Sequence, residues 1–378
     1  MRTLFVFFFS ILSLTQINAQ IENVTTKYDL PTQVEETSGL VFVNGKLITH
    51  NDSGDAANLY EIDTISGSIT RTISINNATN VDWEDITKDD TYLYIGGFGN
   101  NNGSRQDLKV YRVLISDFIN NTSISSETIS FSYEDQTDFT SKPNNNNFDA
   151  ESISVYNDEL IIFSKNWTDN TVNAYSIPKT IGTHSAKKIG SYNSNGLITG
   201  SAYNSNDNSF LLSVYNTSGS PFVIYMANVD IQNVFNGTIE RTELVAAIGI
   251  GSQIEGITVI DEGKYFLSRE KVNTVVSGFN IVINQALFRI DNGSFTPLGV
   301  DEFDLTHVKM YPNPTNEILY IKGITIKHLT IIDANGKKIF EQKKANNQIE
   351  IKQLTPGIYF LKIVSENNTL ITKKFIKN

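Results

Sequence analysis

The chain has 378 residues, of which 40% are hydrophobic and 11% aromatic, a composition typical of globular rather than disordered proteins. It carries 30 basic and 41 acidic residues, and this net charge of −11 argues against nucleic acid as a partner, because phosphate backbones bind basic surfaces. Cysteine is absent, which excludes disulfides, thiol nucleophiles, cysteine-ligated metals and a lipid anchor on an N-terminal cysteine.

Residues 1–19 have the pattern of a secretory signal. Arg2 precedes an apolar run from Leu4 to Leu14, and the small residue Ala19 stands before Gln20. A membrane anchor is the alternative, but the apolar run is shorter than the roughly 20 residues that a membrane-spanning helix needs. No later run is long enough, so we expect no transmembrane span in the mature chain.

A repeat unit is clearest in residues 80–103, and weaker copies begin near residues 37, 150, 199 and 254. Each copy has a small or acidic leading residue, an apolar strand, a turn rich in Asn, Asp and Gly, and a second strand ending in polar residues. The leading residues, which lie 46, 67, 49 and 55 residues apart, are Ser38, Glu84, Glu151, Gly200 and Glu255. This spacing is in the range of propeller blades.

Two further strands are expected in each of the first four units, because Val, Ile, Tyr and Phe alternate there with polar residues. In chain order they are Asn58–Asp63 and Ser68–Ile75, Leu108–Ile115 and Thr128–Tyr133, Val172–Ile177 and Lys187–Tyr192, and Phe222–Asn228 and Glu240–Ala246. The fifth unit has a clear third strand, Ala286–Asp291, but only a weak fourth. The mature N-terminus aligns with an outer strand and can supply the missing one.

We therefore predict an all-β protein in which residues 20–303 form a five-bladed β-propeller, closed by an N-terminal strand that completes the last blade. Such closure removes the open sheet edges that invite aggregation. A sixth, degenerate blade between Ser116 and Asn147 is the alternative.

The C-terminal residues 304–378 differ from the rest in charge. From Val308 onward there are 12 lysines against 5 acidic residues, a balance of +7, whereas the preceding residues have 18 Lys and Arg against 36 acidic, a balance of −18. A change of sign at a boundary indicates a separate module. Short alternating strands joined by turns predict a small β-sandwich here.

Four motifs of this module occur together: YPNP at 311–314, Asp333-x-x-Gly336, Leu354-x-x-Gly357-x-Tyr359 and a lysine-rich final strand. Residues 308–378 thereby resemble the type A sorting domain of the type IX secretion system of Bacteroidetes. The resemblance implies that this module engages the type IX secretion machinery and carries no catalysis. It also implies that the protein is secreted or displayed on the outer-membrane surface.

The propeller geometry predicts where a functional site should lie. The starts of the innermost strands and the ends of the second strands meet at one face, around the central channel. Glu84, Glu151 and Glu255 would converge there, and carboxylates held close together repel unless a cation intervenes. Carboxylate and amide oxygens suit Ca²⁺, so we predict that these three glutamates bind calcium. The alternative is structural: the glutamates cap backbone amides and pair with Lys165 and Arg269.

Polar residues at the ends of the second strands are predicted to bind a small molecule or a surface polymer. These candidate ligand-binding residues are Asn51, Asp52, Asn100, Asn101, Lys165, Asn166, Arg269 and Glu270. The sequence contains no G-x-S-x-G motif, and His50 is the only histidine in these converging segments, so a Ser-His-Asp triad is not expected.

The pattern E-[DSG]-I, with Trp-Glu-Asp-Ile at 83–86, resembles bacterial propellers of the SdiA-regulated and phytase-esterase-like groups, and more distantly the calcium-dependent lactonase propellers. In the last group a glutamate at such a position is a metal ligand, which is matched by Glu84, Glu151 or Glu255. Three functions follow as expectations: ligand or partner binding on the channel face, calcium-dependent hydrolysis of a phosphoester or lactone, and a purely structural surface role.

Overall fold

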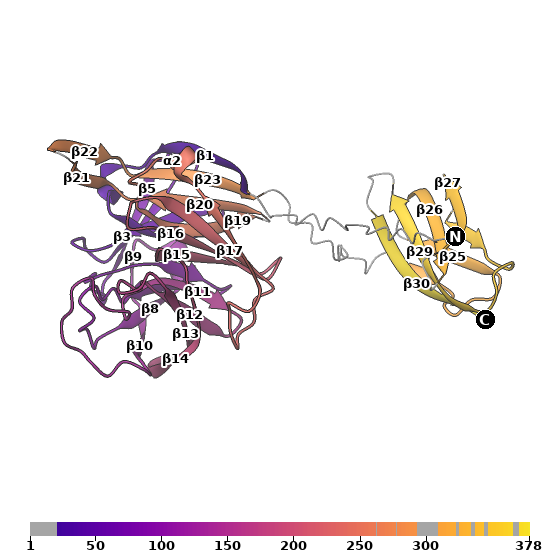
Figure 1. The fold of residues 1–378 in the computed structure, drawn as a ribbon, viewed down its shortest axis with the longest axis horizontal. Helices are drawn as coiled ribbons and strands as arrows, with labels where there is room; N and C mark the ends of the chain where they lie inside the picture. Colours follow the sequence, from indigo (N-terminus) through magenta and orange to yellow (C-terminus); the bar gives the residue numbers. More distant parts are fainter. Residues whose placement is uncertain are drawn as a thin grey trace, which may run out of the picture. The chain divides into compact units, whose positions relative to one another are not determined.

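The computed structural model describes residues 21–261, 263–276, 278–292, 309–322, 325–333, 337–343, 347–365 and 370–378. The chain divides into two compact units, Met1–Phe295 (unit 1) and Thr296–Asn378 (unit 2), and both are built from β-strands (Figure 1). The helical segments in the described part are short: η1 (Thr32–Val34), α1 (Ile115–Asn120) and α2 (Val245–Ile248). The predicted secretory signal lies outside the described residues.

Within the described part of unit 1, five sets of four neighbouring strands follow one another along the chain, and we number them sheets 1 to 5. Sheet 1 consists of β2 (Thr37–Val43), β3 (Lys46–Asn51), β4 (Asn58–Ile62) and β5 (Ile69–Ile75). Sheet 2 consists of β6 (Ile86–Lys88), β7 (Tyr92–Gly97), β8 (Lys109–Leu114) and β10 (Glu127–Tyr133). Sheet 3 consists of β11 (Ala150–Tyr156), β12 (Glu159–Ser164), β13 (Val172–Pro178) and β14 (Gly182–Tyr192).

The last two sheets follow the same antiparallel order. Sheet 4 consists of β15 (Leu197–Asn204), β16 (Ser209–Tyr215), β17 (Pro221–Ala227) and β18 (Thr238–Glu243). Sheet 5 consists of β19 (Ile254–Asp261), β20 (Lys264–Arg269), β23 (Ala286–Asn292) and β1 (Ile21–Asp29). The N-terminal strand β1 pairs antiparallel with β23, so the predicted completion of the last sheet by the N-terminus is confirmed.

Several smaller features of unit 1 were not predicted. The two-residue strand β9 (Ser123–Ile124) pairs in parallel with β5, and β10 pairs in parallel with β14, which joins the outer edges of sheets 2 and 3. The hairpin of β21 (Val272–Val276) and β22 (Phe279–Ile283) projects beyond sheet 5 (Figure 1). The segment from Ser116 to Asn147, considered above as a sixth blade, contains most of α1 together with β9 and β10.

The first strands of the five sheets contact one another in a cycle: β2 with β6, β6 with β11, β11 with β15, β15 with β19, and β19 with β2. Glycines permit this close approach. A Cβ atom on Gly256 would lie 2.4 Å from the carbonyl oxygen of Ser38, and one on Gly200 would lie 2.4 Å from that of Glu255. Side chains at these positions would therefore push the strands apart.

Turn chemistry fixes the register of these strands. Between β2 and β3, Asn44 and Gly45 have φ angles of 50° and 77°, the left-handed values required at both central positions of a tight hairpin turn. β2 then pairs with β3 from Val43↔Lys46 onward, which places Val41 opposite Ile48 in the core.

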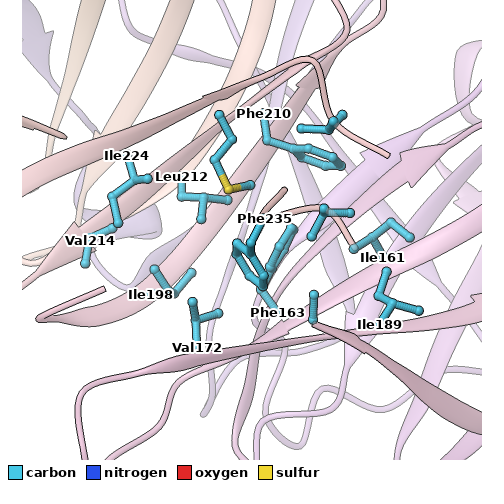
Figure 2. Close-up of a cluster of buried hydrophobic side chains, with 14 of the residues drawn as sticks. Ile161, Phe163, Val172, Ile189, Ile198, Phe210, Leu212, Val214, Ile224 and Phe235 are labelled. Atoms are coloured by element: carbon cyan, nitrogen blue, oxygen red, sulfur yellow. The ribbon is translucent and has the colours of Figure 1, made fainter. Parts of the chain in front are cut away.

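The apolar cores of unit 1 lie between successive sheets. One cluster joins Phe163 and Val172 of sheet 3 to Phe210 and Leu212 of sheet 4, and Figure 2 shows these side chains packed against one another. Equivalent clusters join sheets 1 and 2, 2 and 3, 4 and 5, and 5 and 1. Every sheet therefore buries both of its faces, which explains its nearly continuous apolar strands.

Unit 2 consists of two sheets that share one core. One sheet contains β24 (Lys309–Tyr311), β25 (Ile318–Lys322) and β28 (Gln348–Glu350). The other contains β27 (Lys338–Lys343), β26 (Ile326–Asp333), β29 (Gly357–Ser365) and β30 (Leu370–Lys377). Leu319 and Ile349 of the first sheet pack with Leu329, Leu361 and Phe375 of the second.

Candidate functional site

Seven carboxylates gather at one end of the cycle of inner strands. They stand at the beginning of an inner strand or just after a second strand, where the propeller geometry predicted them. The seven, which influence one another electrostatically, are Asp52, Asp82, Glu84, Asp149, Glu151, Glu255 and Glu270. We call them the acidic cluster.

Lys165 is the basic side chain buried within the acidic cluster. It follows β12 and its Nζ lies 3.1 Å from Oε2 of Glu151, with both side chains less than a tenth exposed. Burial by itself lowers the pKa of Lys165, but Glu151 and the other carboxylates outweigh burial and raise this pKa well above its usual value. Lys165 is therefore protonated and neutralises one carboxylate.

The remaining carboxylates hold their protons more tightly than free carboxyl groups. Burial, followed by repulsion from Asp82, raises the pKa of Asp52 to about 8. Burial and the charge of Glu36 raise the pKa of Glu270 to about 7. Burial and the charges of Glu151 and Asp52 raise the pKa of Glu84 well above its usual value. The acidic cluster thus contains more carboxyl groups than one lysine can neutralise, and without a cation several of them keep a proton.

Three members of the cluster have the geometry of a cation site. One oxygen each from Asp52, Asp82 and Glu84 lies within 4.8 Å of the others. Oδ1 of Asp52 is buried and accepts no hydrogen bond from the described residues. Gly99 closes the site on one side, because a Cβ atom there would lie 2.0 Å from Oε1 of Glu84 and 2.5 Å from the carboxyl carbon of Asp82.

The three predicted metal ligands have different surroundings. Glu84 belongs to the trio with Asp52 and Asp82, whereas Glu151 pairs with Lys165. Glu255 is buried within the cluster, where burial, followed by the charge of Glu270, raises its pKa well above the usual value. Asp82 and Asp149, which flank the predicted positions, complete the cluster.

The eight predicted ligand-binding residues separate into three groups. Asp52, Lys165 and Glu270 belong to the cluster or contact it, whereas the amides of Asn100 and Asn166 hold loops together. Asn100 donates its side-chain amide to Phe148 (3.0 Å), and Asn166 donates its own to Thr171 (2.7 Å). These two side chains have structural partners.

The other members of the set lie at the edge of the cluster or away from it. Asn51 donates to Gln33 (2.9 Å) and to Asp55 (2.8 Å), while its own side-chain oxygen is buried without a hydrogen-bond partner in the described part of the chain. Asn101 accepts a hydrogen bond from Asn144 through its backbone carbonyl (2.9 Å).

Arg269 does not join the acidic cluster. Its guanidinium donates to the carbonyls of Asn284 (2.9 Å) and Ile248 (3.1 Å) and lies over the ring of Phe288. Arg269 is the last residue of β20 and is held by these backbone carbonyls, whereas Glu270, the next residue, belongs to the acidic cluster.

Asp85 performs a structural task beside the cluster. Its carboxylate is fully buried and accepts hydrogen bonds from the backbone N–H groups of Ile86 (2.8 Å), Ile153 (3.0 Å) and Ser201 (3.4 Å). It therefore ties together β6, β11 and β15. The amide-capping role that we considered for the three glutamates is carried out by this neighbouring aspartate.

A cavity of about 890 Å³ adjoins the acidic cluster on the side of sheets 4, 5 and 1. Trp167 and Tyr215 line it, and both rings lie within 5.5 Å of Nζ of Lys165. Asp149 accepts a hydrogen bond from the indole N–H of Trp167 (2.7 Å). Tyr215 was not predicted as a site residue, although it precedes Asn216 at the end of a second strand.

Residues 309–378 match the family model "Secretion system C-terminal sorting domain". The match supports the predicted type IX sorting domain, and it implies export to the cell surface or outer membrane through the type IX machinery. No helix in the described part of the chain is long and apolar enough to cross a membrane.

No curated protein matches the sequence. Among solved structures, the chain is similar to PorZ, a surface component of the type IX secretion system of Porphyromonas gingivalis, with 12% identity and a TM-score of 0.35 over 90% of this chain and 45% of PorZ. This chain therefore spans less than half the length of PorZ. It is also similar to the α-L-arabinofuranosidase Arb93A of Fusarium graminearum, with 9% identity and a TM-score of 0.39 over 70% of this chain and 96% of the enzyme. Similarities this low carry no argument about function.

Proposed function

We propose that unit 1 is a five-bladed β-propeller that binds a ligand at the acidic end of its central channel, with a Ca²⁺ ion held by Asp52, Asp82 and Glu84. Residues 1–19 act as the signal for passage across the inner membrane, residues 20–303 form the propeller, and residues 304–378 direct type IX export. The protein then works in the extracellular medium or on the cell surface.

The observation that supports the cation is the excess of buried carboxyl groups over buried basic side chains in the acidic cluster. Burying carboxylates is costly unless protons, basic side chains or a metal ion compensate them. Lys165 compensates one carboxylate, that of Glu151. Asp52, Asp82 and Glu84 each place one oxygen within 4.8 Å of the others. Oδ1 of Asp52 is buried and has no hydrogen-bond partner among the described residues. The donors are all oxygens, which favours a hard cation such as Ca²⁺ over zinc or copper.

Isothermal titration calorimetry with CaCl₂ tests this proposal on the full mature chain. We expect one site of high occupancy in the wild type and a loss of at least ~10-fold in affinity for Asp52→Asn combined with Glu84→Gln, because two charged ligands are removed. Asp158→Asn is the matched control, since the Asp158 side chain is fully exposed and distant from the trio. Equal heats for the wild type and the double variant would reject the cation site.

A calcium-dependent hydrolase is the second candidate, and the cavity beside the trio favours it. A substrate that extends from the cavity into the acidic cluster would reach the cation, which could polarise a phosphoryl or carbonyl oxygen and activate water. Calcium-dependent turnover of a phosphoester or lactone, lost in the same double variant, would establish this candidate. Calcium binding without turnover on a panel of both substrate classes leaves ligand binding as the function.

A further inference from the structure

The cavity beside the acidic cluster has a wall that identifies the chemistry of its ligand. Backbone hydrogen bonds connect the cavity to the acidic cluster. The N–H of Asp52 donates to the carbonyl of Glu36 (2.9 Å), and the N–H of Glu270 donates to the carbonyl of Gln253 (3.1 Å). Glu36 and Gln253 line the cavity. The cavity therefore adjoins the acidic cluster through the backbone next to Asp52 and Glu270.

Two aromatic rings form one part of this wall. Trp167 is held in place by its hydrogen bond to Asp149, and Nζ of Lys165 lies 4.9 Å from its ring centroid and 5.5 Å from that of Tyr215. Both rings are partly exposed, so they present a fixed apolar surface to a ligand. The negative face of an aromatic ring attracts partially positive hydrogens, such as the axial C–H groups of a sugar ring.

Uncommitted amide and hydroxyl groups form another part of the wall. In the described part of the chain, the side chains of Gln253, Asn273 and Thr217 line the cavity and make no hydrogen bond to the protein. Amides and hydroxyls both donate and accept hydrogen bonds, as vicinal hydroxyl groups of a sugar do. Groups of this kind suit a ligand rich in both donors and acceptors.

The charges around the cavity exclude other ligand classes. Glu35 and Lys271 form an ion pair with a distance of 2.6 Å, while Glu36 adds a negative charge to the cavity wall. These wall charges favour a neutral ligand over an anionic one wherever the ligand does not contact the cation. A purely apolar ligand would leave Gln253 and Asn273 buried without partners, which is unfavourable.

We propose that the cavity bounded by Trp167, Tyr215, Gln253 and Asn273 binds a neutral saccharide. This assignment rests on the proposed function, since it names the ligand class for the same end of the propeller. The ligand would then lie next to the acidic cluster, because Glu36 and Gln253 of the cavity wall bond to the backbone of Asp52 and Glu270. The volume of about 890 Å³ is within the range of small-molecule sites and large enough for a short oligosaccharide.

Affinity electrophoresis of the full mature chain through native gels tests this inference. The gels contain xylan, arabinan, galactomannan, mixed-linkage β-glucan or dextran, each with CaCl₂ or with EDTA. We expect retardation by at least one of these polysaccharides. The double variant Gln253→Ala, Asn273→Ala should bind at least ~10-fold more weakly, because two hydrogen-bonding groups are lost.

The double variant Gln232→Ala, Asn280→Ala is the matched control, because both side chains are exposed and neither lines the cavity. Retardation by none of the five polysaccharides, or equal retardation of the two double variants, overturns the saccharide site. Binding of fluorescent pentalysine in place of polysaccharide also overturns it, and assigns the cavity to basic peptides.

Calcium calorimetry on the same samples keeps the saccharide proposal and the cation proposal separate. Retained calcium binding with no retardation rejects the saccharide alone, and retardation in EDTA without calcium binding rejects the cation alone.

Discussion

Two opposing effects act on the carboxyl groups at the channel mouth. Burial favours the neutral form of each group, and a nearby basic side chain favours the charged form. Trp167, Asp149, Glu151 and Lys165 form a connected chain in which an indole N–H, two carboxylates and an ammonium satisfy one another. On the other side of the mouth, Asp52, Asp82 and Glu84 have no basic partner as close as Lys165 is to Glu151 among the described ion pairs. This difference separates a structural half of the cluster from the half that we assign to a cation.

The raised pKa values predict how stability depends on pH in the absence of calcium. The folded-state pKa is raised to about 8 for Asp52 and to about 7 for Glu270, above the values of roughly 4 that these groups have in an unfolded chain. The folded state therefore binds more protons than the unfolded state between these limits, and its stability falls as pH rises. We expect the melting temperature of unit 1 in EDTA to decrease from pH 5.5 to pH 8.5.

Differential scanning calorimetry across this pH range measures the effect. Each kcal/mol lost corresponds to about 2–4 °C in a domain of this size. Saturating calcium should remove most of the decrease, since the cation takes the place of the protons. A melting temperature that is flat or rises with pH in EDTA would show that the carboxylates are already compensated.

Substitution of Lys165 tests the structural half of the cluster. Lys165→Met leaves Glu151 buried without its partner, and breaking a buried ion pair in this way costs about 3–5 kcal/mol. We expect a lower urea midpoint at pH 8 and a smaller loss at pH 5, because burial raises the pKa of Glu151 and a lower pH favours its neutral form. Lys264→Met is the control: its pair with Asp261 is exposed, so the cost should stay below about 1 kcal/mol. Equal losses in the two variants would mean that Lys165 is not electrostatically coupled to the cluster.

At the scale of elements, the inner strands approach one another through positions without side chains. Gly256 faces the backbone of Ser38 and Gly39, where an added Cβ atom would meet atoms at 2.4 to 2.7 Å. We expect Gly256→Ala to destabilise unit 1 by about 2 kcal/mol or more, because backbone atoms cannot move aside as a flexible side chain can. Gly357→Ala is the control, since its Cβ atom would meet nothing closer than 3.7 Å. Equal thermal stability of the two variants would contradict the tight contact between β19 and β2.

Alternating apolar residues and Asn-Gly turns were sufficient to predict most strands and the pairing of β1 with β23. The hairpin β21–β22 was missed because its apolar residues, such as Phe279 and Val282, are exposed rather than arranged in a half-buried pattern. β9 was missed because two residues carry no periodicity. The positions of Asp52, Glu84 and Glu270 near one another follow from strand order, but the exclusion of Arg269 follows from its hydrogen bonds to the carbonyls of Asn284 and Ile248, which the sequence pattern does not reveal.

At the scale of the whole molecule, the two units have opposite charge and separate roles. The sorting-domain match covers residues 309–378 and predicts that export depends on this unit. Deleting residues 304–378 should retain the protein in the periplasm of a type IX-competent host, while fusing them to a reporter that carries a secretory signal should release the reporter or display it. Immunoblots of fractionated cells measure both, and a host lacking type IX secretion is the control. Surface delivery of the truncated protein would contradict the assigned role.

The cation site is the claim on which the proposed function depends most. An anomalous difference map from crystals of the mature protein grown with CaCl₂ tests it directly. The account predicts one strong peak with carboxylate oxygens of Asp52, Asp82 and Glu84 at the roughly 2.3–2.6 Å expected for Ca²⁺ ligands. A map without a peak there, with these carboxylates hydrogen-bonded to one another through shared protons, would contradict it.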